Sequence, residues 1–165
     1  MKFRIALAAT LAVGVALGTS GCNLIQPQAT TKHYDASDGI GANVGALKLR
    51  NLIVLSNDGE LGSLLLTGVN TTGKDVTLTV TYGGGKQVQQ VIPSSDLRGT
   101  TWGGHDEAQI ILKDIATAPG SMIELGFTDG VETIPALVPV LTTGQPEYNG
   151  LEPKELFVYS ASSKR

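Results

Sequence analysis

Few side chains of this chain have the chemistry of a metal or catalytic site. Its 165 residues include one cysteine, two histidines and one tryptophan. His105 precedes Asp106 and Glu107, and together they offer nitrogen and oxygen ligands to a divalent ion. Adjacent residues of an extended chain point to opposite faces, so these three side chains do not converge easily. We therefore expect no metal site and no cofactor, and keep His105 as a candidate ligand only.

The irregular stretch 93–107 also holds Trp102, beside Gly103 and Gly104. Loops on a rigid scaffold carry recognition disproportionately, and tryptophan is a frequent anchor of protein interfaces. Trp102 and His105 therefore form a candidate recognition loop. In the alternative interpretation, the indole of Trp102 folds inward and closes one end of the domain.

The sequence offers no set of catalytic residues. A serine hydrolase would have to use His105, because His33 lies in a polar linker, and no Gly-x-Ser-x-Gly turn is present. Residues 83–86 read Gly-Gly-Gly-Lys, but no Ser or Thr follows the lysine as a phosphate-binding loop requires. Strand patterns flank this run on both sides, which indicates a hairpin turn. We expect a protein that is not an enzyme.

Cys22 is the only cysteine, so no disulfide can form within the chain. It follows two basic residues, an apolar run over residues 5–17, and the small residues Ser20 and Gly21. This order is typical of a secretion signal, and its end resembles the bacterial lipobox, in which the thiol receives a diacylglyceryl group. The alternative is an ordinary secretory signal with an incidental thiol.

Lipidation at Cys22 predicts where the protein is found. Each buried methylene contributes about 0.8 kcal/mol, and two or more acyl chains anchor a protein stably. We expect residues 1–21 to be a lipoprotein signal peptide, and Cys22 to anchor the chain to the outer face of the cell membrane. Loss of the two basic residues of the signal takes the formal charge from -3 to -5. That acidic balance does not favour nucleic acid.

The remaining chain divides by composition into three parts. Residues 22–45 are polar and predict a flexible tether, in which His33 is solvated. Residues 46–141 carry the strand patterns of one domain. Residues 142–165 predict a mostly disordered tail with an apolar island at residues 156–159. That island is either an extra strand of the domain or a docking segment for a partner.

Apolar and polar residues alternate along the domain as in half-buried strands. The alternation slips at Asn51, which indicates a bulge or a strand that passes into full burial. Residues 87–92 are polar enough for an edge strand. Pro135 and Pro139 confine the last strand to an edge or to partly unpaired positions. Strands are predicted at 47–55, 61–70, 76–82, 87–92, 110–115, 123–127 and 131–141. About seven strands at this spacing predict an all-β, immunoglobulin-like antiparallel sandwich.

Two resemblances bear on this domain. Residues 46–51 and the turn at 71–75 resemble small actinobacterial lipoproteins of the LpqE type. Residues 119–130 and 138–140 are similar to the end of the periplasmic copper chaperone family, a cupredoxin-like β-sandwich. The resemblance covers residues 41–141 and implies a shared scaffold.

The copper ligands of that family, clustered histidines and methionines, do not transfer to this chain. The chain beyond Cys22 keeps one methionine, Met122, with parity opposite to Ile123 and Phe127, and we interpret it as a packing residue. We expect a membrane-anchored, non-enzymatic binding or adaptor module of the cell envelope, with an envelope protein as partner. The alternative is a metal chaperone that uses His105, Met122 and His33.

Overall fold

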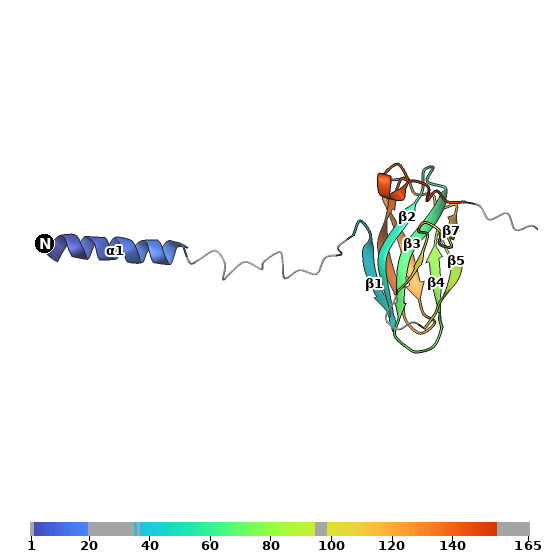
Figure 1. Cartoon of the computed structure of the whole chain (residues 1–165), viewed down its shortest axis with the longest axis horizontal. Helices are drawn as coiled ribbons and strands as arrows, with labels where there is room; N and C mark the ends of the chain where they lie inside the picture. Colours follow the sequence, from blue (N-terminus) through green and yellow to red (C-terminus); the bar gives the residue numbers. More distant parts are fainter. Residues whose placement is uncertain (1, 20–34, 36, 95–98, 155–165) are drawn as a thin grey trace, which may run out of the picture. The chain divides into compact units, whose positions relative to one another are not determined.

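The computed structural model describes residues 2–19, 35, 37–94 and 99–154 of the chain (Figure 1). The chain divides into two units, one of residues 1–34 and one of residues 35–165. The first unit contains the helix α1, Lys2–Thr19, which covers the predicted apolar run. No helix among the described residues is long and apolar enough to cross a bilayer. Cys22, His33 and the rest of residues 20–34 lie outside the described part.

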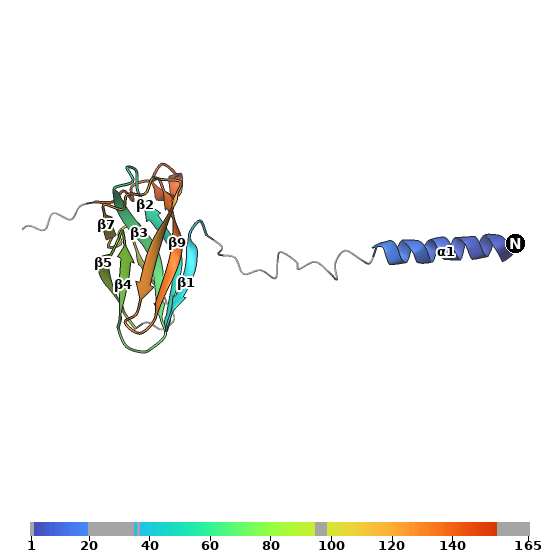
Figure 2. The ribbon, with the colours of Figure 1, turned by 180° about the vertical axis from the view of Figure 1, so that it is seen from behind.

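The second unit is built from strands, and the all-β prediction is confirmed (Figures 1 and 2). Each of the seven predicted strands is present. The described residues form β1 (Ile40–Val44), β2 (Leu47–Leu55), β3 (Leu61–Asn70), β4 (Val76–Tyr82), β5 (Lys86–Ile92), β6 (Thr100–Trp102), β7 (Ile110–Lys113), β8 (Met122–Thr128) and β9 (Thr133–Leu141).

Two of these strands were not predicted. β1 lies in the segment predicted to be a tether, and that prediction is wrong for residues 40–44. Its five residues pair with β2 and bury Ala42 and Val44 in the core, a pattern too short to stand out in a glycine-rich segment. β6 has three residues and lies within the stretch predicted to be irregular.

The strands form two layers that are joined at one side. The hydrogen-bonded order is β5-β4-β8-β9-β2-β3-β6, with β1 also paired to β2 and β7 also paired to β3. β4, β5, β8 and β9 make one layer, and the other five strands make the second. Each pair is antiparallel except β2 with β9, which is parallel, so the prediction of a purely antiparallel sandwich is wrong at this junction.

The junction is short because β9 has two different edges. One edge pairs with β8 from Thr133 to Pro139. On the same edge, the Val140 carbonyl accepts the Gly120 N–H at 2.8 Å and the Val140 N–H donates to the Ser121 carbonyl at 2.9 Å. Edges alternate along a strand, so Pro135 and Pro139 point their nitrogens to the edge that faces β2. Proline nitrogens carry no hydrogen, and β9 meets β2 only at Val140 and Leu141. The prediction that these prolines occupy partly unpaired positions is confirmed.

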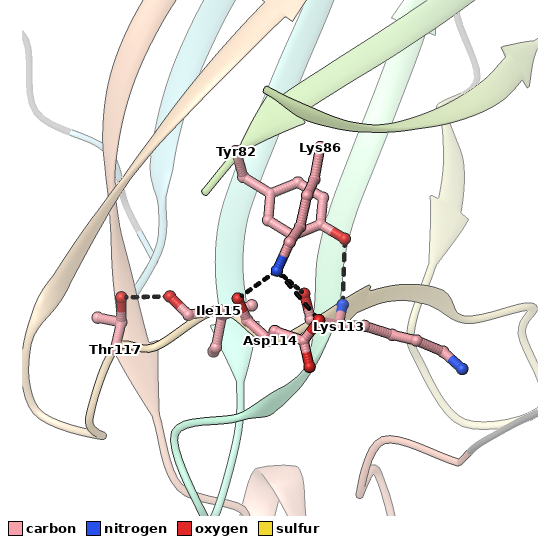
Figure 3. A network of polar contacts seen from close by, with 6 residues as sticks. All are labelled: Tyr82, Lys86, Lys113, Asp114, Ile115 and Thr117. Atoms are coloured by element: carbon pink, nitrogen blue, oxygen red, sulfur yellow. Dashed lines mark hydrogen bonds and ion pairs between the residues drawn. The ribbon is translucent and has the colours of Figure 1, made fainter. Parts of the chain in front are cut away.

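Side chains close the opposite side of the two layers (Figure 3). The Tyr82 hydroxyl accepts the Lys113 N–H at 3.1 Å, so β4 is tied to the end of β7. The Lys86 ammonium donates to the carbonyls of Lys113 and Asp114 at 3.3 and 3.0 Å, and to the Asp114 carboxylate at 3.1 Å. The turn before Lys86 uses three glycines with positive φ, as the predicted hairpin requires. The domain is therefore a nearly closed sandwich.

A bulge at Asn51 lets β2 bury apolar residues on both of its faces. Asn51 has φ +53°, and the pairing with β3 shifts between Arg50 and Ile53, which confirms the predicted bulge. Leu47, Leu49, Leu52 and Val54 point into the main core between the layers. Ile53 and Leu55 point outward, where they meet Leu65, Tyr148 and Leu151 in a second apolar cluster.

Residues 142–154 cover that second cluster, and we call this segment the strap. The prediction of a mostly disordered tail is wrong for the strap, because Tyr148 and Leu151 are only 7% and 5% exposed. A short 3-10 helix at Pro146–Tyr148 turns the chain across the outer face of the sheet. Two buried apolar residues in an otherwise polar segment form no periodic pattern, so the sequence did not indicate that this segment packs against the domain. The apolar island at residues 156–159 lies outside the described residues.

Polar side chains of the domain hold the strap at both ends. The Asn57 side chain accepts the Thr143 N–H at 3.0 Å, directly after β9. The Gln109 side chain donates to the Glu152 carbonyl at 3.0 Å and accepts the Lys154 N–H at 2.9 Å. The strap is thus part of the folded domain and not an appendage.

We expect Leu151→Ala to lower the free energy of unfolding by about 2–5 kcal/mol, because it empties a buried site between the strap and β3. Leu137→Ala is the matched control, since Leu137 is 57% exposed and its truncation should change stability by less than about 0.5 kcal/mol. Urea denaturation followed by circular dichroism measures both. Equal effects of the two substitutions would contradict the packed strap.

Candidate functional site

The structure separates the residues that the sequence singled out. Trp102 ends β6 with 5% exposure and belongs to the main core, so its indole packs against the domain and is not displayed for recognition. His105 is exposed in the loop between β6 and β7. Met122 begins β8 in the other layer and is 50% exposed, so its interpretation as a packing residue is wrong. Cys22 and His33 lie outside the described residues.

A hollow of about 490 Å³ lies beside His105. Its walls include Asp106, Glu107 and Gln109 from the same loop, with Leu151 and Lys154 from the strap. No group of three histidine, cysteine or acidic residues within the described part of the chain has the geometry to hold a metal ion. The hollow therefore presents mixed charges without a recognisable ligand set.

The outer face of the layer β5-β4-β8-β9 divides into two chemically different halves. On β4 and β5 the outward positions hold hydroxyl and amide side chains, as a solvated face requires. Those outward residues are Thr77, Thr79, Thr81, Gln87, Gln89 and, at the edge, Val91. On β8 and β9 the outward residues are mostly apolar, with Met122 and Leu137 exposed by 50% and 57%.

The apolar half is organised by β9. Residues Pro135, Leu137, Pro139 and Leu141 alternate along the strand and share its outer face; we call them the apolar row. The cross-strand register places Glu124 opposite Leu137 and Met122 opposite Pro139. Residues on the inner face, from Ile134 to Val140, are apolar as well. This continuous apolarity is visible in the sequence, where the prolines predict an edge strand or partly unpaired positions but no exposed apolar row.

Two hollows lie along the apolar row. The lower one, about 240 Å³, is lined by Glu124, Pro135, Ala136 and Leu137. The upper one, about 620 Å³, lies where β9 passes into the strap. Its lining residues are Asp38, Pro119, Gly120, Leu141, Thr142, Gln145, Glu147 and Tyr148.

The charges along this surface are all negative. Glu124 lines the lower hollow, Asp38 and Glu147 line the upper hollow, and neither lining contains a lysine or arginine. The Tyr148 hydroxyl donates to the Asp38 carboxylate at 2.8 Å. Burial of the phenol and the nearby Asp38 carboxylate raise the pKa of Tyr148 to about 12. The row is therefore an apolar surface with acidic residues at both hollows.

No protein-family model, curated protein or solved structure matches this chain.

We expect the hydrogen bond between Tyr148 and Asp38 to make the free energy of unfolding depend on pH in the alkaline range. The folded state raises the pKa of Tyr148 from 10.0 to about 12, so its stabilisation is complete below pH 10 and is lost as the pH rises to about 12. Tyr148→Phe removes this dependence and, at neutral pH, costs about 1–3 kcal/mol for the lost bond to a carboxylate. Urea unfolding of both proteins at pH 8 and pH 11 measures it. An equal loss of stability between pH 8 and pH 11 in the native protein and in Tyr148→Phe would contradict the role given to Tyr148.

The packing of Trp102 is tested by fluorescence, because it is the only tryptophan of the chain. We expect a blue-shifted emission and weak quenching by iodide in the native protein, since the indole is 5% exposed. Unfolding in urea should shift the emission to the red and restore quenching. A native spectrum like that of the unfolded chain would show that the indole of Trp102 is exposed and would contradict its burial.

Proposed function

We propose that this chain is a lipid-anchored protein of the cell envelope whose domain binds a partner protein, without catalysis, through the apolar row of β9. The observation that carries the proposal is the exposure of Leu137 and Met122, 57% and 50%, on one half of a sheet face. The other half of the same face carries threonine and glutamine, with one exposed apolar residue, Val91, at its edge. Contiguous exposed apolar residues with a polar surround are typical of interaction sites.

The energetics of the row favour association with a protein surface. Removing apolar area from water contributes about 25 cal/mol per Å², and a rigid strand presents that area with little loss of conformational freedom. The row is held by the complete ladder to β8 on one side. A partner therefore meets a preformed surface, which lowers the cost of binding.

The proposed anchor limits where the partner is found. The chain from Cys22 to Asp38, the first residue at the upper hollow, spans 16 residues. A chain of that length reaches at most about 55 Å when fully extended. The proposal thus assigns the partner to the membrane or to the envelope layer next to it.

The proposal is tested by crosslinking in cells and affinity purification of the full-length protein. We expect one recurrent partner, which is lost with Cys22→Ser because the protein leaves the membrane fraction, and which is depleted several-fold with Leu137→Ser. Val131→Ser is the matched control, since Val131 is 96% exposed at the hairpin between β8 and β9 but lies off the row.

Two outcomes would contradict the adaptor function. One is a set of partners that does not change with Cys22→Ser or Leu137→Ser. The other is the absence of any partner together with copper in the purified protein, which would favour the chaperone alternative.

A further inference from the structure

We infer that the apolar row binds an extended peptide segment with a basic residue at each end and an aliphatic residue between them. The inference rests on the proposed function and names the chemistry of the partner at the same surface.

The first step is the position of the carboxylates relative to the row. Glu124 stands opposite Leu137 at the lower hollow, and Glu147 and Leu141 both line the upper hollow. Leu141 follows Leu137 by four positions along β9, which corresponds to about 13 Å in a strand. An extended partner that follows β9 and reaches both positions therefore carries its two cationic groups about four residues apart.

The second step is that no described residue neutralises the carboxylates of Glu124 and Glu147. In residues 35, 37–94 and 99–154, neither Glu124 nor Glu147 forms an ion pair, and the pair of Lys86 with Asp114 lies on the other side of the sandwich. Glu124 and Glu147 are exposed. Each carboxylate next to an apolar surface favours a partner that places a lysine or arginine against it.

The third step is the conformation of the partner. Successive members of the row are two residues apart, about 7 Å along the strand. An extended peptide directs every second side chain to one side with the same spacing. A segment of the form basic-x-aliphatic-x-basic thus places its central side chain over Pro139, next to Leu137, with one end beside Glu124 and the other at the upper hollow.

The relative strengths of the contacts decide how binding responds to substitution. An exposed ion pair contributes about 0.2–1 kcal/mol, so the two pairs select the partner and the apolar contact supplies much of the affinity. Removing either kind of contact should weaken binding. Binding should also fall with added salt, because the carboxylates are solvent-exposed.

The test uses the full-length lipidated protein in detergent and the peptide acetyl-Lys-Thr-Leu-Thr-Lys-amide carrying a neutral fluorophore. Fluorescence anisotropy should report saturable binding. The double variant Glu124→Lys with Glu147→Lys should bind this peptide about tenfold more weakly, because two attractive pairs become repulsive. Glu107→Lys is the matched control, since Glu107 is exposed at the other hollow, and it should bind as the native protein does.

Four results would overturn the inference. Equal binding of the peptide to the double variant would show that the two carboxylates do not contribute to binding. Equal binding of a peptide with serine in place of leucine would show that the apolar contact does not contribute. Sedimentation of the native protein as a dimer that Leu137→Ser dissociates would make a second copy the occupant. If the peptide fails while the partner in cells still depends on Leu137, the chemistry assigned here is wrong and the adaptor function stands.

Discussion

The two edges of β9 determine how this domain is built. Its edge toward β8 is a complete antiparallel ladder, whereas its edge toward β2 holds only the parallel pairs of Val140 and Leu141. Pro135 and Pro139 remove hydrogen-bond donors from the second edge, so the sheet separates there into two layers. The layers can then face each other and enclose one core. The side-chain bonds of Tyr82 and Lys86 complete the enclosure on the far side (Figure 3).

The same strand connects the core to the surface proposed for binding. Its inner residues, Val138 and Val140, are fully buried, while its outer residues form the apolar row. At the end of the row the outer face passes under the strap, where Tyr148 covers Leu55 and Leu65. The strap thus covers one apolar part of the outer surface, against which Leu141 packs, and leaves Pro135, Leu137 and Pro139 uncovered. In this account, the row is left for a partner molecule.

Much of the fold was predictable from local patterns. Alternation located seven strands, the slip at Asn51 located a bulge, and the prolines located an incomplete edge. Long-range features were not predictable, because the parallel pairing of β2 with β9 and the docking of Tyr148 join residues far apart in sequence. The candidate site was missed for a related reason: strand parity placed Met122 outward, but only the assembled sheet shows that Leu137 and Pro139 are its neighbours.

The most direct measurement is photo-crosslinking in cells from a reactive amino acid placed at residue 137. Residue 79, on the threonine half of the same sheet face, is the comparison position. The account predicts one discrete adduct from residue 137 that requires Cys22, and none from residue 79. An adduct of equal strength from residue 79, or no adduct from residue 137 while the partner still copurifies, would contradict the assignment of the apolar row as the binding surface.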